Sequence, residues 1–186
     1  MATKTGFRPR RAVLMVCISS AGGNPVTDPL PQPVHDDTKP VILALNNAHA
    51  AELSWLEAAQ LEALLQEAFY ARQIGDGAAF LLAFDQAASY QSPNFRWFCQ
   101  RYRRFVYIDR VVVAPLLRGR GYARTLYTDL FARAGRIGHT LGVCEVNSDP
   151  PNPASDAFHA TMGFAEVGYA VIHHGSKSVR YLARPL

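Results

Sequence analysis

The residues best suited to bind an anion form a turn between an apolar segment, residues 105–113, and a stretch of apolar residues at helical spacing. Gly119 and Gly121 have no Cβ, so the backbone of this turn can approach a ligand closely. The start of the next helix leaves N–H groups without intrahelical partners, and such groups favour phosphate. Three side chains add positive charge: Arg118, Arg120 and Arg124. The turn therefore predicts a site for a phosphate-bearing ligand.

Two common phosphate motifs are excluded by the residues that follow the glycines. The Walker motif needs a Lys-Ser/Thr pair that the chain lacks, and the dinucleotide fingerprint needs a third glycine where Arg124 stands. An ordinary strand-to-helix turn with a solvated basic face remains the alternative interpretation of these residues.

The turn resembles a cofactor signature of the GCN5-related N-acetyltransferase (GNAT) superfamily, Arg/Gln-x-x-Gly-x-Gly/Ala, which is filled here by Arg118, Gly121 and Ala123. A second segment, residues 152–164, resembles the other signature of that superfamily, which begins with Asn and closes with Gly-Phe. The resemblance assigns cofactor contacts to Val111, Val112, Val113, Arg118, Gly119, Arg120, Gly121, Tyr122, Ala123, Asn152 and Phe158.

The resemblance implies an enzyme that binds acetyl-CoA and transfers the acetyl group directly to an amine. The pyrophosphate would lie on the glycine turn, where backbone donors and positive charge meet. The pantetheine arm would pair with a strand edge at residues 111–113. A backbone N–H near Val112 would stabilise the oxyanion that forms at the thioester carbon.

One position departs from the family pattern, because His159 stands where relatives commonly carry the Tyr that protonates the departing thiolate. We expect His159 to be the general acid. An imidazolium with an ordinary pKa of about 6.5 can protonate a thiolate whose conjugate acid has a pKa of about 8.5. A modest upward shift of the His159 pKa would suit this role, whereas a purely structural histidine is the alternative.

Two carboxylates are candidates for the general base that accepts the ammonium proton. Asp109 and Glu145 lie on the strands expected to flank the cofactor cleft. We place Asp109 first, since it shares strand parity with Val111 and Val113. The alternatives are an ion pair between Asp109 and a neighbouring arginine, and a role for Glu145 in holding a loop.

Composition limits the class of protein. The chain has 186 residues, of which 49% are hydrophobic, and a net charge of +4, so it can bury one core and needs no nucleic-acid partner to explain its charge. Cys17, Cys99 and Cys144 form no C-x-x-C pair and predict free thiols in a cytoplasmic protein. We expect no metal, since the only adjacent histidines, residues 173–174, have no carboxylate or cysteine beside them, and no membrane helix.

The expected organisation is an extended or disordered arm, residues 1–39, followed by a single acetyltransferase domain, residues 40–186. The expected fold class is α/β (α+β), with a mixed sheet that has helices on both faces; the resemblance implies a mostly antiparallel sheet with splayed central strands. The predicted strands are residues 41–45, 78–84, 105–113, 141–146, 166–173 and 178–183. The predicted helices begin near Ser54, Tyr122 and Asn152, and the first of them is expected to end at Gly75.

Three function classes stay open at this point. The leading one is an N-acetyltransferase for a small-molecule or peptide amine, with loops at residues 85–95 and 49–54 as specificity elements and a homodimer as a possible assembly. A non-catalytic acyl-CoA sensor would keep the turn without the acid and base. A nucleic-acid-binding module would use the aromatic and basic residues 95–104, although a short amphipathic segment that covers the sheet is favoured there.

Overall fold

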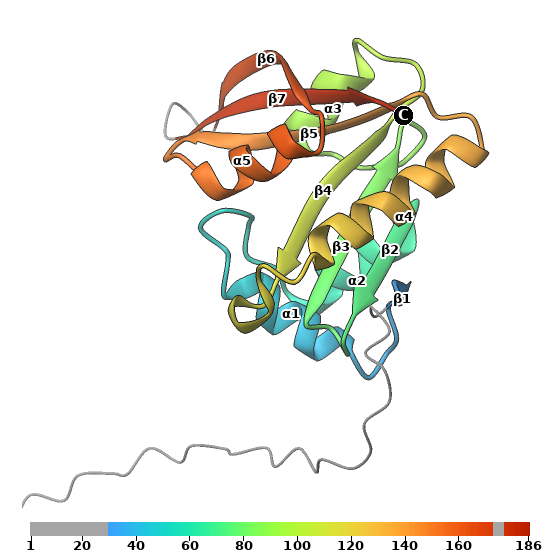
Figure 1. Cartoon of the computed structure of the whole chain (residues 1–186), viewed down its shortest axis with the longest axis vertical. Helices are drawn as coiled ribbons and strands as arrows, with labels where there is room; N and C mark the ends of the chain where they lie inside the picture. The colour runs from blue at the N-terminus through green and yellow to red at the C-terminus, as the bar shows by residue number, and fades with distance from the viewer. Residues whose placement is uncertain (1–29, 173–176) are drawn as a thin grey trace, which may run out of the picture.

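The computed structural model describes residues 30–172 and 177–186. Within these residues the chain forms one seven-stranded sheet of order β1-β2-β3-β4-β5-β7-β6 (Figure 1). All neighbouring strands are antiparallel except β4 and β5, which are parallel. The strands are β1 (Gln32–Pro33), β2 (Tyr70–Ile74), β3 (Ala79–Asp85), β4 (Val106–Val113), β5 (Leu141–Asp149), β6 (Ala165–Ile172) and β7 (Lys177–Pro185). The expected mixed, mostly antiparallel sheet is confirmed.

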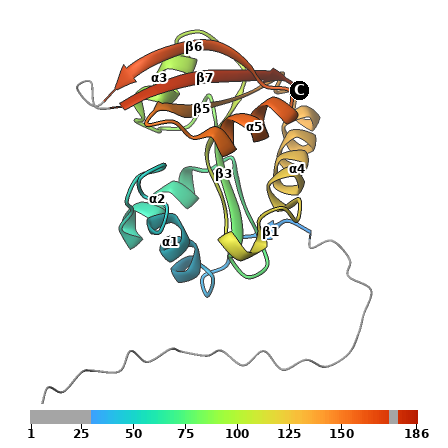
Figure 2. The same ribbon diagram turned by 60° about the vertical axis from the view of Figure 1, so that its left-hand side comes forward.

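Helices cover both faces of this sheet (Figure 2). Helices α4 (Tyr122–Arg136) and α5 (Pro153–Thr161) pack on one face, where Leu126, Leu130 and Phe164 belong to one apolar cluster. Helices α1 (Lys39–Asn47), α2 (Ala58–Glu67) and α3 (Pro93–Cys99) cover the other face. No helix in the described part of the chain is long and apolar enough to cross a membrane.

The central strands β4 and β5 pair over only two positions, Val106 with Gly142 and Tyr107 with Val143. Beyond Tyr107, β4 continues to pair with β3 and β5 continues to pair with β7. The β3–β4 register shifts between Leu82 and Ala83, which leaves Asp109 as an extra residue on β4. A bulge of this kind bends a strand and increases its twist, so it helps to separate β4 from β5. The expected splay of the central strands is confirmed.

Two predicted elements near the N-terminus are wrong. Residues 41–45 form part of helix α1 rather than a strand, because Pro40 opens the helix and the buried residues Ile42 and Asn46 are four apart. The helix predicted to run to Gly75 ends at Glu67, and strand β2 follows it. A short apolar run fits a buried strand and one face of a helix equally well, which explains the first error.

Most of the expected N-terminal arm, residues 1–29, lies outside the described residues, as do residues 173–176, which include most of the turn expected between the last two predicted strands. Strand β1 falls within the range of the arm and pairs with β2 through Gln32 and Gln73.

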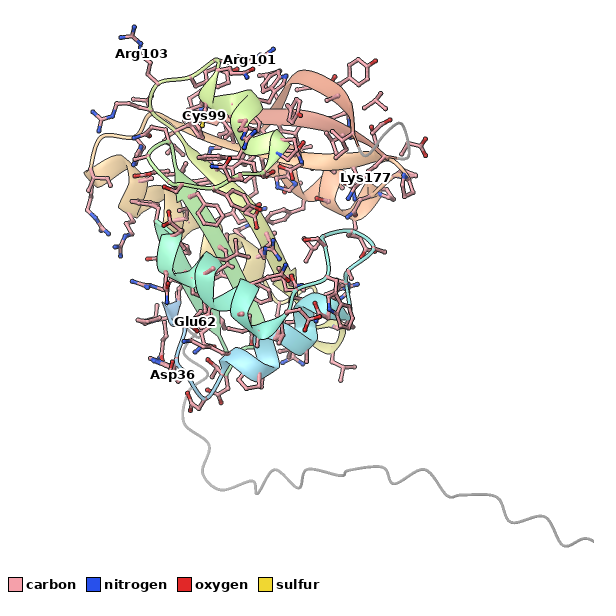
Figure 3. The ribbon with its side chains drawn as sticks, turned by 180° about the vertical axis from the view of Figure 1, so that it is seen from behind. Asp36, Glu62, Cys99, Arg101, Arg103 and Lys177 are labelled. Carbon is pink, nitrogen blue, oxygen red and sulfur yellow. The ribbon has the colours of Figure 1, made fainter. Side chains whose placement is uncertain are left out.

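The aromatic and basic segment covers the sheet. Phe95 and Phe98 of α3 are buried in the core, so these rings are not available to stack on bases. Arg101 lies over the ring of Trp97 at 3.8 Å, and Figure 3 shows Arg101 and Arg103 at the outer surface. The segment therefore covers the sheet with its aromatic side chains and exposes its arginines.

Gly168 on β6 provides a sensitive test of this packing. A Cβ at Gly168 would meet Trp97 Cζ2 at 2.6 Å, and Trp97 cannot move away because it is stacked on Tyr181 with ring centroids 4.2 Å apart. We expect Gly168→Ala to lower the free energy of unfolding by about 1–3 kcal/mol in thermal and denaturant unfolding. The control is Gly135→Ala in α4, where a Cβ would meet nothing within 4 Å, and it should stabilise by up to about 1 kcal/mol. Equal effects of the two substitutions would contradict this account.

Candidate active site

A cleft of about 980 Å³ lies where β4 and β5 diverge. The residues that line it come from β4, β5, the glycine turn, α4, α5 and the α1–α2 connection. Of the expected site residues, only Arg120 does not line the cleft; those that do are Asp109, Val111, Val112, Val113, Arg118, Gly119, Gly121, Tyr122, Ala123, Glu145, Asn152, Phe158 and His159. The structure therefore brings together residues that are up to 50 positions apart, from Asp109 to His159.

The glycine turn has the backbone geometry that an anion-binding turn requires. Gly119 has φ +77° and Gly121 has φ +82°, in the left-handed region that L side chains rarely adopt. A Cβ at either position would meet nothing within 4 Å, so the space beside the turn is open. Gly121 is the N-cap of α4, which has no side-chain cap and no acidic residue in its first turn. The first N–H groups of α4 are thus left for a ligand, and the turn fits a pyrophosphate.

Arginines hold positions around this turn. Arg118 donates from Nε to the carbonyl oxygen of Val113 at 3.3 Å, and its Nη2 lies 3.3 Å from His49 Nε2. Arg124 also lines the cleft and donates to Thr161 Oγ1 at 3.3 Å. Both guanidinium groups are exposed, so they can turn toward an anion without breaking a buried contact.

The edge of β4 that faces β5 is free of ladder partners beyond Tyr107 in the described structure. On its other edge β4 pairs with β3, through Val111 with Leu81 and Val113 with Ala79. An extended amide chain could therefore pair with the free edge, in the way that a peptide adds to a sheet.

Helix α5 presents His159 to the cleft from the α4 face of the sheet. Asn152 caps the helix by accepting from the Ser155 N–H at 3.1 Å, and Pro153 occupies the first helical position. His159 is only 4% exposed, and its Nε2 lies 2.8 Å from the Tyr127 hydroxyl. Its Nδ1 lies 2.8 Å from the Ser155 carbonyl oxygen and 3.2 Å from the Ser155 hydroxyl.

These contacts define the protonation state of His159. A carbonyl oxygen can only accept, so Nδ1 donates to Ser155 and Nε2 accepts from Tyr127 when the ring is neutral. Burial lowers the pKa of His159, and the Ser155 carbonyl and Asp156 oppose this shift. Burial thus shifts the pKa of His159 in the direction opposite to the one that would suit a charged acid, because the ring is desolvated and no described carboxylate lies at hydrogen-bond distance.

Asp109, the first candidate for the base, has both carboxylate oxygens in hydrogen bonds. Oδ1 accepts from the Tyr90 hydroxyl at 2.6 Å, and Oδ2 accepts from Arg110 Nε at 2.6 Å. The side chains of Asp109 and Arg110 are only 5% and 4% exposed, respectively. The ion pair with Arg110 that was the alternative for Asp109 is thus present, whereas Arg104 donates to the Ile137 carbonyl instead.

Glu145 lies on β5 and has a different environment. Its Oε1 accepts from Asn94 Nδ2 at 2.9 Å, whereas Oε2 is buried and has no hydrogen-bond partner among the described residues. Removal from water raises the pKa of Glu145 to about 7, with a further contribution from the charge of Asp109; Tyr107 and Asn94 oppose the shift. Glu145 thus combines a free oxygen with a pKa near neutrality, as a general base requires.

Several residues of the cleft were missed from the sequence. Tyr127 was assigned only to the apolar stripe of its helix, and Tyr90 and Asn94 were placed in a loop expected to affect specificity, without individual roles. Their functions depend on partners 19 to 51 positions away, which no local pattern indicates. Among the described residues no group of three or more His, Cys, Asp or Glu side chains is arranged to hold a metal ion.

The raised pKa of Glu145 predicts how stability depends on pH. Between about pH 4.5 and pH 7 the folded protein keeps a proton on Glu145 that the unfolded chain has lost, so stability falls as the pH rises. We expect the wild-type free energy of unfolding, relative to that of Glu145→Gln, to fall by on the order of 3 kcal/mol over this interval. Urea titrations at fixed pH values measure it. Parallel curves for the two proteins would contradict the assignment.

Comparison with known proteins agrees with the geometry. A model of the acetyltransferase (GNAT) family matches residues 50–164, and no curated protein sequence matches the chain. Ard1 from Thermoplasma volcanium has a TM-score of 0.68 at 13% identity, covering 86% of this chain and 99% of that one. A chain of the NatC complex bound to Gag peptide and CoA has a TM-score of 0.63 at 14% identity, with coverages of 86% and 99%.

The ribosomal-protein-S18-alanine N-acetyltransferase from Escherichia coli is similar as well, with a TM-score of 0.58 at 17% identity over 83% of this chain and 92% of that one. These likenesses show a shared fold, and the family model covers more than half of the sequence. The splayed sheet, the glycine turn and the family match together show that this chain belongs to the GNAT family of acetyltransferases and is an acyltransferase.

Proposed function

We propose that the protein is an acetyl-CoA-dependent N-acetyltransferase that transfers the acetyl group directly to a primary amine. The observation that carries this proposal is a single cleft with an open phosphate-type turn at one end and the unpartnered Oε2 of Glu145 within it. A mere acyl-CoA sensor needs the turn but has no use for a buried carboxyl held near neutrality, since such a group lowers stability.

The cofactor contacts are proposed for the residues that line the α4 side of the cleft. Gly119, Gly121 and the first N–H groups of α4 would hold the pyrophosphate, with Arg118 and Arg124 supplying charge. The free edge of β4 at residues 111–113 would hold the pantetheine arm. When bound, the cofactor supplies a thioester, whose carbonyl carbon is the acetyl donor. We do not assign Arg120 to this site, because it lies outside the cleft.

Glu145 replaces Asp109 as the proposed general base. Both oxygens of Asp109 are held by Tyr90 and Arg110, whereas Oε2 of Glu145 is free to accept a proton. In the proposed reaction the amine loses a proton to Glu145, an N–C bond forms to the acetyl carbon, and the C–S bond breaks. The proton on Glu145 then returns to solvent.

On the other face of the sheet, the proposed proton donor to the thiolate is the Tyr127 hydroxyl, with His159 as its positioning residue. The Ser155 carbonyl fixes the proton of the neutral ring on Nδ1, so Nε2 accepts from the Tyr127 hydroxyl and holds it at the cleft. When the C–S bond breaks, the Tyr127 O–H would turn from Nε2 to the thiolate and give it the proton, and Tyr127 would then be reprotonated from solvent. His159 is therefore proposed to act as a neutral ring that positions Tyr127, in place of the charged general acid expected from the sequence.

The proposed acceptor is a slender amine, either a small molecule or a peptide terminus. The α1–α2 connection closes over the cleft, because the Glu52 carbonyl accepts from Asn147 Nδ2 at 3.1 Å and from Lys177 Nζ at 3.3 Å. Figure 3 shows Lys177 beside this connection. Solved structures with the same fold include an enzyme named for a ribosomal-protein alanine, which supports a peptide acceptor.

Release of CoA thiol in the presence of acetyl-CoA and a panel of amines and short peptides tests the proposed function. We expect thiol release that requires an amine, and a KM for acetyl-CoA raised about tenfold or more in Gly121→Val, because a side chain there occupies the open space beside the turn. Gly135→Ala in the same helix is the control and should leave KM unchanged. Tight acetyl-CoA binding with no amine-dependent release across the panel would favour the sensor instead.

The proton-donor pair predicts a second result. His159→Phe and Tyr127→Phe should each lower kcat by about 10- to 100-fold at pH 7 with little change in KM, and the double variant should be no worse than the more impaired single one. Wild-type turnover by His159→Phe between about pH 6 and pH 9 would remove this assignment.

A further inference from the structure

A chain of hydrogen-bonded polar groups includes three residues that line the cleft, Tyr90, Asp109 and Arg110. Asp109 and Arg110 form an ion pair on the bulge of β4, with Nε and Oδ2 2.6 Å apart. The Tyr90 hydroxyl donates to Asp109 Oδ1, and Arg110 Nη1 donates to Asn46 Oδ1 at 2.8 Å. Asn46 in turn donates to the carbonyl of Ser54, in the α1–α2 connection. The pair is thus fixed from three elements and cannot rearrange freely.

Arg110 is the cation that balances this site. Burial by itself lowers the pKa of Arg110, but the neighbouring Asp109 and Tyr90 more than compensate, so the net pKa is raised and the guanidinium stays charged. Its remaining contact is with Asn46, which is neutral. The charge of Arg110 is therefore directed at Asp109 alone among the described carboxylates.

Glu145 lines the same cleft as this pair, and the charge of Asp109 contributes to its raised pKa. The titratable groups that face or adjoin Glu145 are Asp109 and Tyr107 on β4, Tyr90 before α3, Tyr127 on α4, Tyr181 on β7 and Cys144 on its own strand. Burial raises the pKa of each of these tyrosines and of Cys144, so they stay neutral near pH 7. The charge of the Asp109–Arg110 pair is then the main local charge acting on the pKa of Glu145, and a substitution can remove it.

We propose that the Asp109–Arg110 pair is a positioning and charge-balancing unit that sets the pH range in which Glu145 accepts the proton of the acceptor amine. This inference rests on the proposed function, in which Glu145 is the base. Neither residue of the pair transfers a proton itself. The negative charge of Asp109 opposes ionisation of Glu145, and the positive charge of Arg110 weakens that effect.

The two members of the pair should have opposite effects, which distinguishes this role from a structural one. Asp109→Asn leaves the cation of Arg110 unbalanced, so Glu145 ionises more easily and the midpoint of the acidic limb of kcat/KM falls by about one pH unit. Arg110→Met leaves the charge of Asp109 unbalanced, and the midpoint rises by a similar amount. In the double variant Asp109→Asn/Arg110→Met, the midpoint should lie between those of the two single variants.

A second ion pair, which is partly exposed to solvent, provides the control. Lys39 and Glu62 form an ion pair between α1 and α2, outside the cleft, and Figure 3 shows Glu62 on α2. Lys39→Met and Glu62→Gln change the net charge by the same amounts as the two test variants and should leave the midpoint unchanged. A shift in these controls equal to that in the test variants would overturn the inference, because the effect would then be one of net charge.

Two further measurements keep the inference testable if Arg110→Met folds poorly or if the acceptor stays unidentified. Arg110→Lys keeps the charge and should keep the midpoint near the wild-type value. A stability measurement needs no turnover. The difference in thermal stability between wild type and Glu145→Gln changes with pH as Glu145 titrates. The same difference, measured between Asp109→Asn and Asp109→Asn/Glu145→Gln, should change at a lower pH. Shifts of the same sign in Asp109→Asn and Arg110→Met would overturn the inference.

Glu145→Gln tests the proposed base separately. We expect this variant to lose the acidic limb of the kcat/KM profile. If the limb persists, Glu145 is rejected as the base, and the stability measurement still tests the effect of the pair on Glu145.

Discussion

The separation of β4 from β5 is the constraint on which the rest of this structure depends. Two parallel strands that begin as neighbours share only the pairs Val106–Gly142 and Tyr107–Val143, and each then completes its ladder with a different partner. The backbone of β4 is left with one free edge in the middle of a sheet, where unpaired polar groups are costly. The bulge at Asp109, the glycine turn and α5 are all arranged around this opening.

The opening also explains why groups with different chemistry meet in one cleft. A sheet normally isolates its two faces, so His159 and Tyr127 on the α4 face would not share a space with Glu145 and Asn94 on the α3 face. Where the strands part, both faces reach the same volume. The proposed proton acceptor and proton donor can therefore act on opposite sides of one reacting carbon without contacting each other.

Local sequence patterns were sufficient to predict the structural role of a residue that acts through its own backbone or its position in a helix. Gly121 and Asn152 are such residues, since a left-handed φ and an N-cap are short-range requirements. They were insufficient for Asp109 and Glu145, because the partner Tyr90 lies in the loop before α3 and the partner Asn94 in the first turn of α3, and no local pattern indicates either contact. Strand β2 was missed for the same reason, since it is defined by its pairing with β3 and not by its composition.

The short β4–β5 ladder divides the sheet into two locally connected halves, β1 to β4 and β5 to β7. Each half is built from antiparallel neighbours, whereas few backbone hydrogen bonds join one half to the other. An extended ligand between the halves would supply part of the missing ladder, in effect as an additional strand. Such a ligand would join the two halves by backbone hydrogen bonds in addition to its part in the reaction. When the product leaves, the two halves would again be joined by few backbone hydrogen bonds.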